Sequence, residues 1–139
     1  MRLFTMGRVF RPDQEDAGHS KVFHQADVLC AGQGVSPADM KDTLTRVIGA
    51  VLGHVELAWE PHCFPRFEDG FEASVRHEEQ PVGIAGCGMM SAATLSEAGQ
   101  DPEKVSGFCC GMGLERLAML KYGIDDVHAL RRPPYLPLT

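Results

Sequence analysis

The sequence predicts an α+β fold in which helices flank an antiparallel β-sheet. The order of strand-like and helix-like stretches along the chain is one reason, since strands paired through turns pack against helices in this class. Short polar turns between successive strand-like runs are a second reason. The third is that 139 residues, of which 44% are hydrophobic, are enough for one domain with a core of its own.

The chain begins with a predicted β-hairpin. Residues 3–11 read as the first strand, a polar loop follows, and residues 21–31 form the returning strand. Side chains alternate between the two faces of a strand. We therefore expect Arg11 and His19 to face each other at the mouth of the hairpin, with Phe23 one short step further along.

A helix is predicted next, because Ser36 is a good N-cap and Pro37 suits the first helical position. Its apolar residues recur at helical spacing and lie on one face as far as the turn near Gly53. Further elements follow in order. The predicted strands cover residues 54–59, 71–77, 82–87 and 105–110, and the predicted helices cover residues 91–98, 114–122 and 125–130. The domain is expected to span residues 1–130, followed by a proline-rich tail at 131–139.

The hairpin carries the chemistry of a nucleoside triphosphate site. An arginine guanidinium such as that of Arg11 clamps phosphate oxygens through paired, charge-assisted hydrogen bonds. A second cation, here His19, can hold a far phosphate, and the ring of Phe23 can support the base. The residues alone also allow plainer interpretations, in which Arg11 pairs with Asp13 or Asp16 and Phe23 packs in the core.

Two stretches of the sequence resemble motifs of the class II aminoacyl-tRNA synthetases, in particular those of the phenylalanyl-tRNA synthetase alpha-subunit family. Residues 10–13 and 19–23, followed by His24 and Gln25, resemble motif 2. Residues 107–126 resemble motif 3, and residues 86–89 fall where the family has a similar landmark. The resemblance implies the class II catalytic fold, which the chain would form in part.

The resemblance also implies roles for individual residues. Arg11 would bind the α-phosphate of ATP and the amino-acid carboxylate, and would stabilise the charge of the transition state. Asp13 would accept a hydrogen bond from the adenine amine, and His19 would contact the γ-phosphate. Phe23 and Arg116 would hold the two faces of the base, with Arg116 also reaching the γ-phosphate. A pairing of Arg116 with Glu115 or Asp126 is the alternative.

On the amino-acid side, Gln25 and Asp27 match the residues that grip the substrate ammonium, although a solvated strand face explains Asp27 equally well. Phe64 keeps one aromatic wall of the substrate pocket. Arg66 replaces one aromatic wall of the family pocket, and Cys109 with Cys110 replaces another.

These departures predict that phenylalanine is a poor substrate and that an acidic or larger polar amino acid suits Arg66 better. An Arg66 side chain that turns to solvent, or one neutralised by Glu68, is the other interpretation. Gly83 stands where the family has a glutamate that helps to hold Mg²⁺, so the sequence assigns no metal ligand.

The implied function is ATP-dependent activation of an amino acid to the aminoacyl-adenylate, followed by transfer to tRNA. Two alternatives remain: a paralogue that binds ATP or an acid without charging tRNA, and a non-catalytic module that acts through a partner subunit. A net charge of −6 gives no electrostatic sign of nucleic-acid binding, so DNA is not expected as a partner. Binding of RNA would need positive charge from another chain or from a local basic patch. The resemblance alone implies an amino acid and tRNA as partners, and ATP with Mg²⁺ as cofactors. We also expect a homo- or hetero-oligomer with a synthetase-type subunit, in the cytoplasm. No apolar run approaches the length of a membrane span.

Overall fold

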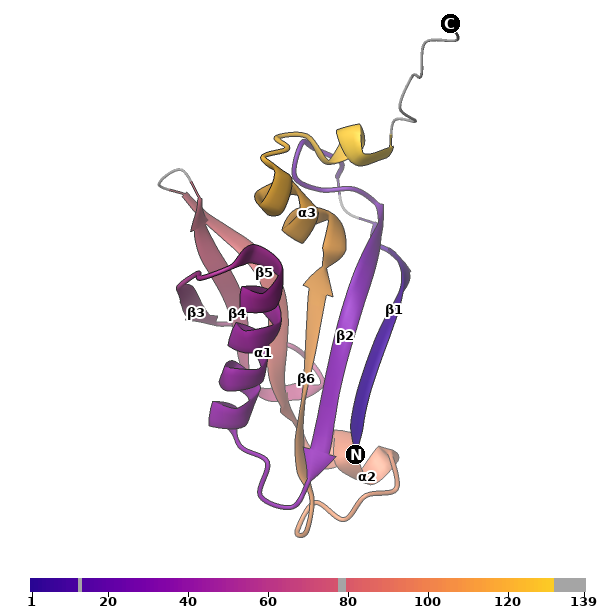
Figure 1. Cartoon of the computed structure of the whole chain (residues 1–139). Coiled ribbons are helices and arrows are strands. Elements are labelled where there is room, and N and C mark those ends of the chain that lie inside the picture. Colours follow the sequence, from indigo (N-terminus) through magenta and orange to yellow (C-terminus); the bar gives the residue numbers. More distant parts are fainter. Residues whose placement is uncertain (13, 78–79, 132–139) are drawn as a thin grey trace, which may run out of the picture.

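The computed structural model of the chain describes residues 1–12, 14–77 and 80–131. Within these ranges the chain forms one six-stranded antiparallel sheet, three α-helices and a short 3₁₀ helix (Figure 1). In chain order, the elements are β1 (Arg2–Phe10), β2 (Val22–Gly32), α1 (Pro37–Leu52), β3 (Leu57–Pro61), β4 (Phe67–His77), β5 (Gln80–Met90), α2 (Ala92–Glu97), β6 (Ser106–Gly113), α3 (Leu114–Tyr122) and η1 (Val127–Arg131). The predicted α+β class is confirmed.

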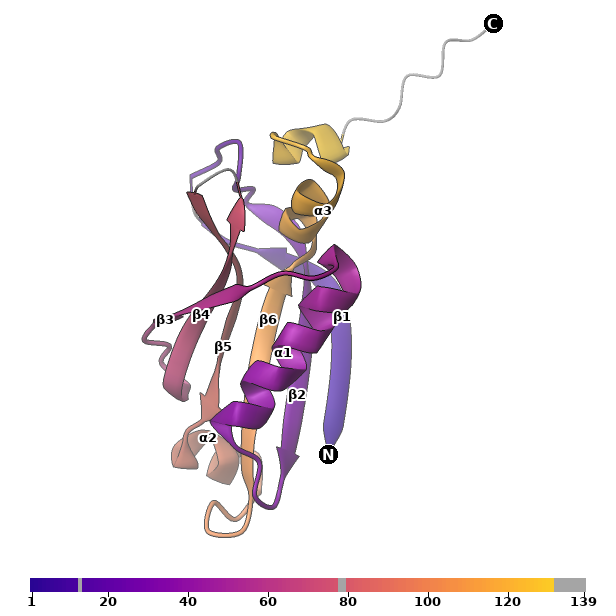
Figure 2. The ribbon, with the colours of Figure 1, turned by 60° about the vertical axis from the view of Figure 1, so that its left-hand side comes forward.

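The strands lie in the order β1-β2-β6-β5-β4-β3. Helix α1 lies across one face of this sheet, with α3 towards one end and α2 towards the other (Figure 2). The apolar side of α1 is buried through Met40, Leu44 and Ile48. It packs in one core cluster with the strand residues that point to the same face, among them Cys87 of β5 and Met112 of β6. The opposite face of the sheet carries the cavity described below.

The helices agree closely with the sequence prediction, whereas several strands are longer than predicted. Strand β4 begins at Phe67, β5 continues to Met90, and β6 continues to Gly113. Glycine is a weak strand former, and glycine-rich stretches therefore hide strand ends from a sequence reading. Pairing with neighbours overrides this preference, since Gly111 pairs with Asp27 on one side and with Gly86 on the other. Strand β3 also begins three residues later than predicted.

Two predicted features lie outside the described residues. They are Asp13 in the hairpin loop and most of the proline-rich tail, at residues 132–139. Residues 78 and 79, between β4 and β5, are outside as well. No helix in the described ranges is long and apolar enough to cross a membrane.

A capping box fixes the start of α1. The Ser36 side chain accepts a hydrogen bond from the backbone N–H of Asp39, and the Asp39 carboxylate accepts one from the backbone N–H of Ser36 at 2.9 Å. These contacts satisfy helix-end N–H groups that have no partner within the helix. The Ser36 hydroxyl also donates to the Asp39 carboxylate at 2.6 Å, and this contact, followed by that with the Ser36 backbone N–H, lowers the pKa of the Asp39 carboxyl.

We expect Ser36→Ala to lower the free energy of unfolding by about 0.5–2 kcal/mol, because it removes this cap. Urea unfolding followed by circular dichroism measures the change. Ser36→Thr is the matched control, since threonine keeps the hydroxyl acceptor. Equal stability of Ser36→Ala and the unaltered chain would show that the cap does not stabilise α1.

Candidate active site

A cavity opens on the sheet face opposite α1. It is bounded by the end of the β1–β2 hairpin, by strands β2, β4, β5 and β6, by the start of α3, and by η1. Its lining residues are Arg11, Gly18, His19, Ser20, Phe23, Gln25, Glu72, Gly83, Ile84, Ala85, Gly86, Gly111, Gly113, Glu115, Arg116 and Val127. The structure therefore brings together five of the residues that the sequence singled out. These five are Arg11, His19, Phe23, Gln25 and Arg116.

Arg116, on the first turn of α3, ties three parts of the cavity together. Its Nη1 donates to the carbonyl oxygen of Gly83 on β5 at 2.9 Å, and its Nη2 donates to the carbonyl oxygen of Gly18 in the hairpin loop at 2.9 Å. Nη2 also lies 2.9 Å from Nε2 of His19. Neither Glu115 nor Asp126 forms an ion pair with Arg116 among the described residues, so its guanidinium is held in the cavity by backbone carbonyls.

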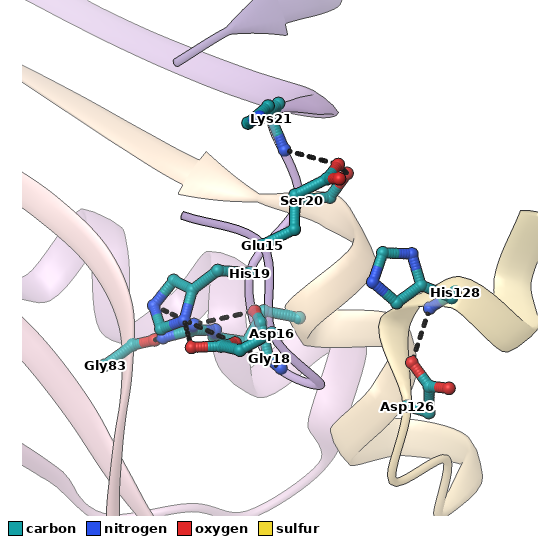
Figure 3. Close-up of polar contacts among 10 residues, drawn as sticks. Glu15, Asp16, Gly18, His19, Ser20, Lys21, Gly83, Asp126 and His128 are labelled. Atoms are coloured by element: carbon teal, nitrogen blue, oxygen red, sulfur yellow. Dashed lines mark hydrogen bonds and ion pairs between the residues drawn. The ribbon is translucent and has the colours of Figure 1, made fainter. Parts of the chain in front are cut away.

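The hairpin loop is shaped by Asp16. Its carboxylate lies 2.8 and 2.9 Å from Nδ1 of His19 and accepts a hydrogen bond from the backbone N–H of Gly18 (Figure 3). The contact with the His19 side chain, followed by that with the Gly18 N–H, holds the pKa of the Asp16 carboxyl below its usual value. Asp16 is thus the partner of His19, which it orients towards Arg116.

Arg11 lies against Phe23. The carbon at the centre of the Arg11 guanidinium is 4.8 Å from the centroid of the Phe23 ring, which is a cation–π geometry. The backbone N–H of Arg11 donates to the carbonyl oxygen of Lys21 at 2.8 Å, so the hairpin pairing continues to this residue. The side chain predicted to bind phosphate and the ring predicted to support a base therefore lie side by side.

Glu115 joins the returning strand of the hairpin to α3, a role that the sequence reading did not predict. Its carboxylate accepts from the backbone N–H of His24 at 2.8 Å and lies 2.9 Å from Nδ1 of the same histidine. The glutamate side chain is largely buried, whereas the histidine is half exposed. This contact fixes β2 against the N-terminal end of α3, and so it fixes Phe23 relative to Arg116.

Gln25 and Asp27 cover the middle of the sheet face. Nε2 of Gln25 donates to Oδ1 of Asp27 at 2.7 Å. Both lie over Gly111, where an added Cβ atom would be 2.8 Å from the Gln25 nitrogen and 3.0 Å from the Asp27 oxygen. Glycine at this position is therefore what lets these two polar side chains reach the floor of the site.

Comparison with known proteins identifies the arrangement. The sequence profile of the tRNA synthetases class II core domain (F) matches residues 1–135. The chain belongs to this family. The phenylalanine–tRNA ligase alpha subunit of Thermosynechococcus vestitus is 37% identical over 127 residues, which are 91% of this chain and 38% of that protein. The alpha subunit of Rhodopirellula baltica is 37% identical over 131 residues, which are 94% of this chain and 38% of that protein.

A solved synthetase structure has the same fold. The pyrrolysyl-tRNA synthetase of Desulfitobacterium hafniense has a TM-score of 0.69 and 20% identity to this chain. The match covers 96% of this chain and 46% of that structure. This class II core domain therefore spans only about two fifths of the length of the curated relatives that it matches.

Next to the cavity of this class II core domain, two phenylalanine rings lie on the sheet. A Cβ atom added at Gly86 would meet the tip of the Phe64 ring at 2.9 Å, and one added at Gly88 would meet Cβ of Phe67 at 2.6 Å. The two rings are 5.9 Å apart in an edge-to-face arrangement. The cavity reaches Gly86 but does not continue over Gly88. The sequence reading missed Phe67, although it directly follows the predicted pocket residue.

The structure directs Arg66 away from this region. Its guanidinium forms an ion pair at 3.2 Å with Glu97 of α2 rather than with Glu68, and both side chains are largely exposed. An Arg66 in this position does not offer a second carboxylate-binding group to a substrate in the cavity. Cys109, on β6, is half-buried. Burial raises the pKa of its thiol, and the charge of Asp27 raises it further.

Proposed function

We propose that this core domain binds ATP in the cavity and activates an amino acid as its adenylate. The observation that carries the proposal is the convergence of Arg11, Phe23, His19 and Arg116 on one cavity, from two motifs about 90 residues apart in the sequence. Side chains of these types can bind a base and a chain of phosphates. The family names of the relatives support the same chemistry, since they are phenylalanine–tRNA ligases.

The reaction needs positioning and charge stabilisation rather than a nucleophile from the protein. A carboxylate oxygen of the amino acid attacks the α-phosphorus, the bond to the bridging oxygen of the β-phosphate breaks, and pyrophosphate leaves. Arg11 would stabilise the charge that develops on the α-phosphate oxygens. Phe23 and Arg116 would hold the base, and His19 and Arg116 would hold the far phosphates. Magnesium would neutralise charge on the triphosphate.

The remaining roles follow the same proposal. Gln25 and Asp27 would bind the ammonium group. The support is that their polar atoms meet over Gly111, which lines the cavity. Asp13 would accept a hydrogen bond from the adenine amine. Transfer of the amino acid to tRNA, in the cytoplasm, is the step that would follow.

A partner chain is part of the proposal, because the relatives are named as alpha subunits. Strand β1 supports it from the structure: it is an edge strand, and Leu3, Phe4, Met6 and Phe10 are exposed on it. Exposed apolar side chains on an unpaired strand edge favour association with another chain or a second copy. A module that binds ATP without charging tRNA is the second candidate, favoured by Gly83, which stands where the resemblance implies a glutamate that helps to hold Mg²⁺.

Pyrophosphate exchange measured with each of the twenty amino acids tests this function. The proposal predicts ATP–pyrophosphate exchange that depends on added amino acid. ATP binding without exchange for any amino acid would favour the second candidate. Absence of both binding and exchange would reject the site.

A further inference from the structure

Two glutamates line the cavity, and they differ in their hydrogen bonds. Glu115 is engaged by the backbone and the ring of His24. Glu72, on β4, lines the cavity and makes neither a hydrogen bond nor an ion pair with its side chain among the described residues. An acidic side chain beside a phosphate site repels the ligand unless a cation lies between them.

Gly83 makes room for the Glu72 side chain. A Cβ atom added at Gly83 would lie 3.0 Å from the carboxylate carbon of Glu72 and closer still to one of its oxygens. The carbonyl oxygen of the same glycine accepts the hydrogen bond from Arg116. Glu72 therefore lies at the part of the cavity where Gly83 also holds the Arg116 guanidinium, which is assigned to the far phosphates.

The donor set fits magnesium bound through a nucleotide. Among the residues that the structure describes, no group of three or more histidine, cysteine or acidic side chains could hold a metal by itself. Mg²⁺ is commonly bound by one or two carboxylates together with substrate phosphates and water. A single carboxylate at the phosphate end of the cavity meets this requirement, and the bound metal would supply neutralising charge there.

We propose that Glu72 is the protein ligand for the Mg²⁺ that accompanies bound ATP, and that it supplies from β4 the carboxylate that position 83 on β5 lacks. The inference rests on the proposed function, since it requires ATP in the cavity. It assigns to Gly83 the complementary role of leaving space for that carboxylate. The two residues act as a pair on neighbouring strands.

Calorimetric titration of ATP, with and without Mg²⁺, tests the roles of Glu72 and Gly83 through the affinity for ATP, without a measurement of activity. In the unaltered chain, Mg²⁺ is expected to tighten ATP binding by about tenfold or more. Glu72→Gln keeps the size of the side chain but removes its charge, so ATP is expected to bind this variant with the same affinity in both conditions. Glu103→Gln, at an exposed glutamate in the connection before β6, is the matched control and should behave like the unaltered chain.

The exchanged variant, Glu72→Gly with Gly83→Glu, provides the second arm. It returns a carboxylate to the same place from the other strand, so the dependence on Mg²⁺ should reappear. An unchanged Mg²⁺ dependence in Glu72→Gln would overturn the proposal while leaving ATP binding, and hence the proposed function, intact. Failure of the unaltered chain to bind ATP in either condition would reject the proposed function and this inference together.

Discussion

Arg11→Ala is expected to weaken ATP binding about 10- to 150-fold, because it removes a charge-assisted contact to phosphate worth roughly 1.5–3 kcal/mol. The structure places this guanidinium at the cavity, 4.8 Å from the centroid of the Phe23 ring. Loss of the same charge should also slow adenylate formation, because fewer donors then face the charge that develops on the α-phosphate. Affinity is measured by calorimetry and the rate by pyrophosphate exchange.

Arg46→Ala is the matched control for this experiment. Arg46 lies on α1, on the other face of the sheet, in an exposed ion pair with Asp42. Its removal should leave the fold intact, since exposed pairs of this kind contribute little to stability. It should also leave ATP affinity unchanged, because Arg46 does not line the cavity. If Arg11→Ala binds ATP as tightly as the control, the cavity is not the nucleotide site.

The second large effect concerns the amino acid. With Phe64 over Gly86 and Phe67 over Gly88, the sheet beyond the cavity is already covered by aromatic rings. We expect amino acids with small side chains to be activated best, and phenylalanine poorly. Phe67→Ala should raise kcat/KM for phenylalanine by at least about tenfold, because even one methylene group is worth roughly 10- to 200-fold in an apolar pocket and this change removes a whole ring.

Pyrophosphate exchange with alanine and with phenylalanine, in the unaltered chain and in Phe67→Ala, measures this selectivity. Phe4→Ala, which truncates an exposed phenylalanine on the edge strand β1, is the control and should leave the selectivity unaltered. If phenylalanine is the best substrate of the unaltered chain and Phe67→Ala changes nothing, then the rings do not close the amino-acid side. The preference for an acidic substrate, expected from Arg66, loses its basis because Arg66 pairs with Glu97.

Local signals explain what could be predicted from the sequence. The start of α1 follows from Ser36 and Pro37, and the bounds of α3 agree with the prediction because its periodicity is intact and a left-handed Gly123 ends it. The hairpin residues Arg11, His19 and Phe23 could be grouped because a short loop keeps them close. Strand ends at Gly111 and Gly113 could not be predicted, since only pairing in the folded sheet defines them.

The missed residues of the site share one cause. Glu72, Phe67 and Glu115 each act across strands or between a strand and a helix, through side-chain directions that sequence spacing does not specify. The glycines under them, Gly83 and Gly88, carried a signal, because glycine within a strand often marks a close approach of another group. A glycine in a strand indicates where another group comes close to the backbone, but it does not indicate which side chain does so.

A crystal structure of the chain with a non-hydrolysable ATP analogue tests the central claim most directly. We predict the adenine between the Phe23 ring and the Arg116 guanidinium, the triphosphate directed towards His19, and Arg11 displaced from the ring onto the α-phosphate. An analogue bound outside this cavity, with the Arg11 guanidinium still covering Phe23, would contradict the account.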